Sequence, residues 1–200
     1  MADISIQDLL AEVLESLSVK AYIKDVHLSY FIDEDVVSHF HSDITRLRQI
    51  LINIVGNAVK FTDQGEVKVQ VRREQNCLAF LVIDSGCGID KENVRSLFQP
   101  FNQGDKSTSR KYGGTGLGLV LSKKLCQLLG GDVSLVSSEP GKGSIFKIKL
   151  EMLPLTIPSK VNSKIQKINI SSPPPIKELG RKTLSNFKIL VAEDTTDTQM

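Results

Sequence analysis

Residues 46–61, RLRQILINIVGNAVKF, decide the fold, because they carry two side-chain patterns on one predicted helix. The apolar pattern recurs every three or four residues and predicts one buried face; its members are Leu47, Ile50, Leu51, Ile54, Ala58 and Phe61. Asn53, Asn57 and Lys60 form a polar stripe. At about 100° per residue, these three lie within roughly 60° of one another, beside the apolar face. They are expected to line a cleft, and the alternative is a solvated polar face.

The chemistry of this stripe suits a metal-bound phosphate. Amide oxygens such as those of Asn53 and Asn57 can join the octahedral shell of a hard cation, alongside phosphate oxygens and water. A neighbouring ammonium, here Lys60, neutralises phosphate charge.

A second segment begins with the apolar stretch Cys77–Ile83, which is typical of a buried strand. Asp84 ends it, and a carboxylate at this position can accept a hydrogen bond from the exocyclic amine of adenine. Gly86 and Gly88 allow a sharp turn and a flat ring beside the backbone. The alternative is an ordinary strand-to-turn junction.

A third segment is the glycine run Gly113, Gly114, Gly116 and Gly118, which precedes an apolar helical pattern. That pattern consists of Leu119, Leu121, Leu125, Leu128 and Leu129. Glycines that open a helix present backbone N–H groups and the positive end of the helix dipole to anions. The run fits neither the Rossmann fingerprint nor the P-loop. A glycine-rich linker is the alternative.

In their order and spacing, these segments resemble the nucleotide-binding boxes of the catalytic domain of sensor histidine kinases, from about residue 4 to residue 150. Residues 97–101, LFQPF, look like its phenylalanine box, and residues 141–144, GKGS, look like its last glycine box. The resemblance implies ATP and Mg²⁺ as cofactors, with Asn53 and Asn57 as magnesium ligands. It implies catalytic roles for Asn53, Asn57, Lys60 and Arg110. The residues that it assigns to ATP are Asn57, Lys60, Phe61, Asp84, Gly86, Gly88, Ile89, Phe101, Lys111, Tyr112, Gly113, Gly114, Thr115, Gly116, Leu117, Gly118, Leu119 and Ser144.

Within the resemblance, Asn102–Tyr112 corresponds to the ATP lid. It carries Lys106, Arg110 and Lys111 among small polar residues, so few apolar contacts would hold it and several cations could meet a triphosphate. We expect the lid to be mobile without nucleotide, and Arg110 is the first choice for the γ-phosphate.

Asn53 favours a kinase over a hydrolase. The heat-shock chaperone, gyrase and mismatch-repair ATPases that share this type of pocket place Glu there, as the general base that activates water. Asn cannot accept that proton, whereas phosphoryl transfer to an imidazole depends on positioning and charge stabilisation. The alternatives are an ATP-hydrolysing switch and a nucleotide-binding docking module without transfer.

The phosphate acceptor is expected outside this chain. None of His27, His39 and His41 lies in the family's acceptor motif, so all three are predicted to be ordinary imidazoles. The resemblance places the acceptor His on a dimerisation domain before Met1. The chain is therefore interpreted as the donor half of the reaction.

Composition is typical of a cytoplasmic module. The 200 residues have a 40% hydrophobic share and a net charge of +2, and the 6% aromatic content offers no platform for nucleic acid. The longest apolar run, Cys77–Ile83, is far below the roughly 18 residues that span a bilayer, and no signal peptide is seen. We therefore expect no nucleic-acid partner and no membrane contact by this fragment. The three cysteines are expected to be reduced thiols.

The predicted fold is an α/β two-layer sandwich, in which a mixed, mostly antiparallel sheet has helices on one face. Residues 6–21 predict a helix, residues 26–30 a strand, and residues 67–71 and 77–83 a hairpin. On or near the apolar face of the first helix we expect Leu9, Leu10, Val13, Leu14, Leu17 and Val19.

Three parts are expected along the chain. Residues 1–152 form the catalytic and ATP-binding domain, and residues 153–185 form a Pro/Ser/Lys-rich linker. Residues 186–200 resemble the truncated first strand of a response-regulator receiver domain, with Glu193 and Asp194 as its paired acids. The implied parent is a hybrid sensor kinase, whose partners are the dimerisation domain and a receiver domain or response regulator.

Overall fold

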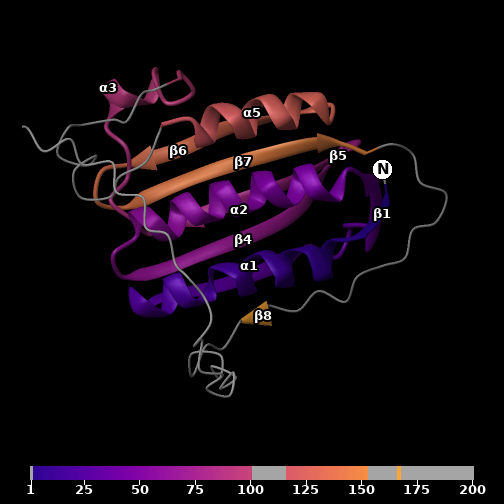
Figure 1. Cartoon of the computed structure of the whole chain (residues 1–200), viewed down its shortest axis with the longest axis horizontal. Coiled ribbons are helices and arrows are strands. Elements are labelled where there is room, and N and C mark those ends of the chain that lie inside the picture. The colour runs from indigo at the N-terminus through magenta and orange to yellow at the C-terminus, as the bar shows by residue number, and fades with distance from the viewer. Residues whose placement is uncertain (1, 101–115, 153–165, 168–200) are drawn as a thin grey trace, which may run out of the picture.

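Three helices cover one face of a mixed β-sheet in the computed structural model, which describes residues 2–100, 116–152 and 166–167 (Figure 1). The helices are α1 (Ile6–Ile23), α2 (Ile44–Phe61) and α5 (Gly118–Leu128). The sheet order is β6-β7-β5-β4-β2-β8. Its strands are β2 (Val26–Ile32), β4 (Gly65–Glu74), β5 (Cys77–Asp84), β6 (Gly131–Glu139), β7 (Gly143–Glu151) and β8 (Gln166–Lys167). Among the described strands of this sheet, β2 and β4 are parallel and the other neighbours antiparallel. The predicted two-layer sandwich is confirmed.

Helix α2 begins two residues before the predicted helix, because Asp43 caps it. The Asp43 carboxylate accepts a hydrogen bond from the Arg46 backbone N–H at 3.1 Å, which satisfies one of the unpaired donors of the first turn. The apolar pattern is buried as predicted, except that Phe61 is only partly buried. The buried residues of α2 are Leu47, Ile50, Leu51, Ile54, Val55, Ala58 and Val59.

Helix α1 packs on the same face and ends two residues later than predicted. Ser5 caps its N-terminus by accepting from the Asp8 N–H at 3.3 Å. The assignment of Val19 to the apolar face was wrong, since its side chain is 44% exposed. Val19 follows Leu17 by two residues, which at about 100° per residue places it on the other side of the helix.

Helix α5 buries less of its leucine pattern than the sequence suggested. Leu121 is 47% exposed and Leu128 is 74% exposed, whereas Leu119, Leu125 and Leu129 pack against the core. The helix lies over the outer strands of the sheet, with β6 as its main strand contact. One side of α5 therefore stays open to solvent.

The β4–β5 hairpin carries Asp84 to the end of the sheet where the candidate site lies. Gln75, at φ 56°, occupies the tight turn, and the register pairs Val67 with Asp84. On the other side of β5, Ser144 of β7 pairs with Asp84. Asp84 thus lies between two neighbouring strands, at the end of the central strand β5.

Three small elements complete the described residues of the first 100. Strands β1 (Ala2–Ser5) and β3 (His39–Ser42) form a separate antiparallel pair, and α3 (Lys91–Val94) is a single helical turn. His27, His39 and His41 lie on strands with exposed side chains, as expected of ordinary imidazoles.

Several predicted segments lie outside the described residues. These are the lid with Arg110, Lys111 and Tyr112, the neighbouring Phe101, Gly113, Gly114 and Thr115, most of the linker, and the receiver-like strand with Glu193 and Asp194. Within the linker, Gln166 and Lys167 form β8, which pairs with Tyr30 and Ser29 at the edge of β2. The sequence pattern assigned no strand there. Among the described helices, none is long and apolar enough to cross a membrane.

Candidate functional site

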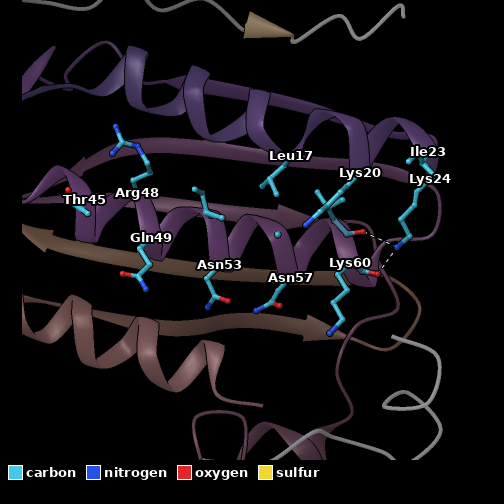
Figure 2. A pocket seen from close by; sticks show the side chains of 13 residues that line it. Leu17, Lys20, Ile23, Lys24, Thr45, Arg48, Gln49, Asn53, Asn57 and Lys60 are labelled. Carbon is cyan, nitrogen blue, oxygen red and sulfur yellow. Dashed lines mark hydrogen bonds between the residues drawn. The ribbon is translucent and has the colours of Figure 1, made fainter. Parts of the chain in front are cut away.

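The polar stripe of α2 forms as predicted. Figure 2 shows Asn53, Asn57 and Lys60 projecting from the same side of the helix. They line a groove of about 880 Å³ together with residues of α1 that include Leu17 and Lys20. Asp84, which the sequence assigned to adenine, does not line this groove. The groove therefore contains the polar stripe of the predicted nucleotide site but not its predicted adenine-binding carboxylate.

The two asparagines of the stripe have different surroundings. Asn53 donates from Nδ2 to the Ser122 hydroxyl of α5 at 2.7 Å, and Ser122 is 2% exposed. A Cβ atom on Gly118 would lie 2.5 Å from Asn53 Oδ1, so the first turn of α5 packs directly on this amide. Asn57 is half-buried and makes no hydrogen bond to the described part of the chain. Among the described residues, the protein therefore holds the Asn53 amide and leaves the Asn57 amide without a hydrogen-bond partner.

Asp84 is held by its neighbours through one oxygen. It is 8% exposed, and Oδ1 accepts from the backbone N–H groups of Gly86 at 2.9 Å and Ser144 at 3.2 Å. No hydrogen bond from the described residues goes to Oδ2. The carboxylate is thus oriented by one oxygen and keeps the other as an acceptor.

A chain of hydrogen bonds joins the glycine-containing turns. The hydroxyls of Ser138 and Ser144 are 2.9 Å apart, and Ser138 Oγ accepts from the Ile89 N–H at 2.8 Å. The Gly141 N–H donates to the Cys87 carbonyl at 2.8 Å. The turn after β5 and the turn before β7 therefore form one unit around Asp84.

Glycine is required in the Asp84 turn by backbone packing. Gly88 has φ +70°, and a Cβ atom there would overlap the Glu139 carbonyl. At Gly86, a Cβ atom would lie 2.5 Å from the Phe61 carbonyl at the end of α2. The Cys87 N–H donates to that same carbonyl at 3.1 Å. This contact joins the Asp84 turn to the helix that carries Asn57 and Lys60.

Burial shifts the pKa values of both charged groups of the site. Burial lowers the pKa of the Lys60 ammonium, which lies 4.8 Å from the Phe61 ring centroid. Burial raises the pKa of Asp84, and the hydrogen bonds from Gly86 and Ser144 offset part of that rise. Both groups have therefore lost part of their hydration, which strengthens their attraction for a ligand of opposite charge or polarity.

The other described site residues lie as follows. Gly116, at φ +68°, and Leu117 lead into α5, and Leu119 lies in its first turn. In the segment that resembles the phenylalanine box, the Phe98 ring lies 4.8 Å from Lys123 Nζ of α5. Sequence reasoning missed Ser122 and Ser138. A serine carries no periodic signal, and the bonds to Asn53 and to the Ile89 N–H span 69 and 49 residues.

The Asn53–Ser122 bond is expected to stabilise the attachment of α5. Ser122→Ala removes the acceptor of a part-buried amide, so we expect a loss of about 1–3 kcal/mol, seen as a lower melting temperature. Amide exchange in α5 should accelerate with it. Ser137→Ala removes an exposed hydroxyl of β6 and should change stability by no more than about 0.5 kcal/mol. Equal melting temperatures for Ser122→Ala and the unmodified chain would contradict this role.

Taken together, the fold and site define a class: an α/β sandwich in which the helix that carries a polar stripe is joined by a backbone hydrogen bond to the glycine turn after a buried carboxylate. Residues 42–154 match the family described as histidine kinase-, DNA gyrase B- and HSP90-like ATPases. The chain is 41% identical over 153 residues to the sensor protein GacS of Pseudomonas syringae pv. syringae, which covers 74% of this chain and 17% of that protein. It is also 41% identical over 153 residues to hybrid signal transduction histidine kinase B of Dictyostelium discoideum, across 74% of this chain and 8% of that protein.

A solved structure agrees with these relatives. The crystal structure of full-length ShkA in complex with AMPPNP matches with a TM-score of 0.70 and 31% identity, over 79% of this chain and 32% of that one. This chain belongs to the family of histidine kinase-, DNA gyrase B- and HSP90-like ATPases, and its ATPase domain is of the histidine kinase type. It spans less than a fifth of the length of these curated relatives.

Proposed function

We propose that this chain binds Mg·ATP and donates the γ-phosphoryl group to a histidine on a dimerisation domain. One observation carries the proposal: the Phe61–Cys87 backbone hydrogen bond of 3.1 Å joins the Asn57–Lys60 turn of α2 to the Asp84 turn. Lys60, which suits phosphates, and Asp84, which suits adenine, are therefore held by segments that are hydrogen-bonded to each other. The AMPPNP complex of ShkA supports the same choice of ligand.

The residues present fit this ligand. The Asn57 amide oxygen is a hard donor that suits Mg²⁺, and Asn53 offers a second through Oδ1, which faces Gly118. Lys60 supplies a cation for phosphate oxygens. Asp84 Oδ2 accepts from the adenine amine. When bound, Mg²⁺ neutralises charge on the phosphate oxygens.

The proposed reaction is an in-line displacement at phosphorus. An imidazole nitrogen forms the new bond to the γ-phosphorus, the bond from phosphorus to the β–γ bridging oxygen breaks, and ADP departs. The imidazole loses its N–H proton to water. Lys60 neutralises phosphate charge and Asn57 helps to position the ligand; positioning and charge stabilisation are the main protein contribution to this class of reaction. Arg110 and Lys111 are proposed to meet the γ-phosphate from the lid.

Two rival functions remain, and residue 53 bears on the first of them. An ATP-hydrolysing switch needs a general base beside the phosphates, whereas the described Asn53 donates its amide to Ser122 at 2.7 Å. That bond supports a positioning role. The second rival is a nucleotide-binding docking module, which would bind ATP without transfer to any supplied acceptor.

The remaining proposals concern the parent protein. We propose that it is a hybrid sensor kinase, as two relatives from Dictyostelium discoideum are named, and that its partners are the phosphoacceptor domain and a receiver domain or response regulator. We also propose that this domain works in the cytoplasm and that residues 186–200 begin a receiver domain.

Phosphotransfer to a supplied acceptor tests the function. The chain should transfer ³²P from Mg·[γ-³²P]ATP to the dimerisation domain of its own parent, and little to itself. The product should be labile in acid and stable in alkali, as phosphoimidazole is. Exchange of the acceptor His for Ala is the control. Acid-stable phosphate would contradict the kinase assignment, and rapid ATP turnover without transfer would favour the hydrolase.

A further inference from the structure

The carbonyl groups that end α2 are bonded from outside the helix. Val59, Lys60, Phe61 and Thr62 follow the last intrahelical acceptor, Ala58, which accepts from the Thr62 N–H at 3.1 Å. Such terminal carbonyls have no partner within a helix. The Phe61 carbonyl accepts from Cys87, as described above.

A single ammonium bonds the other three carbonyls. Lys24 Nζ donates to the carbonyl oxygens of Val59 at 3.0 Å, Lys60 at 2.5 Å and Thr62 at 2.8 Å. An ammonium has three N–H donors, which equals the number of carbonyls. Asp63 lies 3.8 Å away as a further charge partner. A cation at a helix C-terminus also interacts favourably with the helix dipole.

Lys24 reaches this position from a different element. It is the C-cap residue directly after α1, and its side chain is only 27% exposed. Figure 2 shows the side chain extending from the end of α1 to the end of α2, with dashed lines to the α2 backbone. The contact therefore fixes the end of α2 relative to α1, across 35 to 38 residues of sequence.

The last turn of α2 serves both halves of the candidate site. It presents Lys60, with Asn57 one turn earlier, and its Phe61 carbonyl holds the turn that follows Asp84. A movement of this turn would displace the phosphate side and the adenine side together. We infer that Lys24 is a positioning residue of the nucleotide site, acting through the three α2 carbonyls and not by contact with the ligand. This inference rests on the proposed binding of Mg·ATP.

Lys24→Met tests the inference, because it keeps the aliphatic stem and removes all three donors. We expect calorimetric titration to show Mg·ATP affinity reduced about 10- to 100-fold, the scale of a misplacement near 1 Å. Adenosine affinity should fall as well, because the Cys87 turn is attached to the same helix end. Lys24→Arg should recover only part of the lost affinity. It keeps a cation with several N–H donors, but the planar guanidinium cannot direct three of them to the three carbonyls as an ammonium does.

Two controls separate positioning from charge and from general stability. Lys124→Met removes an exposed cation of α5 that does not line the groove and should leave affinity within about twofold, since one exposed charge is well screened. Val13→Ala opens the core of α1 about 16 Å along the helix from Lys24. It should lower the melting temperature and preserve affinity at a temperature where every variant is folded.

The possible outcomes distinguish the Lys24 inference from the proposed function. Unchanged affinity in Lys24→Met beside normal binding by the unmodified chain would overturn the inference alone. A fall of affinity in Val13→Ala in proportion to its lost stability would also overturn it, because the effect would then be general. Absence of Mg·ATP binding by the unmodified chain would overturn the proposed function itself.

Discussion

Asn57→Ala is expected to weaken Mg·ATP binding by about 10- to 100-fold, which corresponds to ~1.4–2.7 kcal/mol at 25 °C. The physical reason is that the Asn57 amide makes no hydrogen bond to the described protein, so in our proposal it is available to Mg²⁺. Its removal should cost little folding stability and mainly metal-dependent affinity. Calorimetric titration with ATP in the presence of Mg²⁺ and in the presence of EDTA separates metal-dependent from metal-independent affinity. The gain in ATP affinity that Mg²⁺ confers on the unmodified chain should nearly vanish in the variant.

Gln49→Ala is the matched control for this result. Gln49 lies on the same side of α2 as Asn57 (Figure 2), and eight residues place it about 12 Å away along the axis. It should bind Mg·ATP within about twofold of the unmodified chain. A Mg²⁺-dependent gain that persists in Asn57→Ala would remove Asn57 from the proposed metal ligands.

Asp84→Asn is expected to have two opposite effects, a loss of ATP affinity and a gain in folding stability. Asn keeps an oxygen for the N–H groups of Gly86 and Ser144, so an NH₂ group replaces Oδ2. That donor would face the adenine amine, and loss of a charge-assisted hydrogen bond of ~1.5–3 kcal/mol predicts about a 10- to 100-fold weaker affinity. The same donor matches the guanine carbonyl, so the preference for ATP over GTP should shrink or reverse in competition titrations.

The gain in stability follows from the direction of the Asp84 pKa shift. Burial raises this pKa above its usual 3.8, so the folded chain holds the proton more tightly than the unfolded chain does. The favourable contribution of the protonated form is present at pH below the unfolded pKa and is lost as pH rises through the folded pKa. At neutral pH the ionised, desolvated carboxylate therefore costs stability, and neutral Asn avoids that cost.

Thermal unfolding at two pH values checks this sign. Asp84→Asn should melt at a higher temperature than the unmodified chain at pH 7, and the difference should narrow near pH 3. Asp33→Asn makes the same charge change at the far end of β2, where Gln70 bonds the carboxylate at 3.2 Å, and should alter neither ATP nor GTP binding. A lower melting temperature for Asp84→Asn at pH 7 would contradict the assigned direction.

The sequence by itself determined the elements and the polar groups of the candidate site. Local periodicity was sufficient for α2, because its buried face and its Asn53–Asn57–Lys60 stripe both repeat at the helical spacing. Turn chemistry was sufficient around Asp84, because Gly88 combines a positive φ with an approach to the Glu139 carbonyl that leaves no room for a Cβ atom. The order of these segments was enough to indicate the family that the comparisons support.

Only the tertiary structure decided how these groups are held and which of them stay available. The bonds from Asn53 to Ser122, from Lys24 to three α2 carbonyls and from Cys87 to Phe61 join residues 26 to 69 positions apart. Ser, Lys and a backbone N–H are common along any chain, and nothing in their local pattern specifies such a partner. Burial is likewise a property of the packed layers, so the pKa shifts of Lys60 and Asp84 and the exposure of Val19 and Leu121 follow from the fold. Hydrogen-bond geometry and desolvation depend on distances in space, which periodicity along the sequence does not determine.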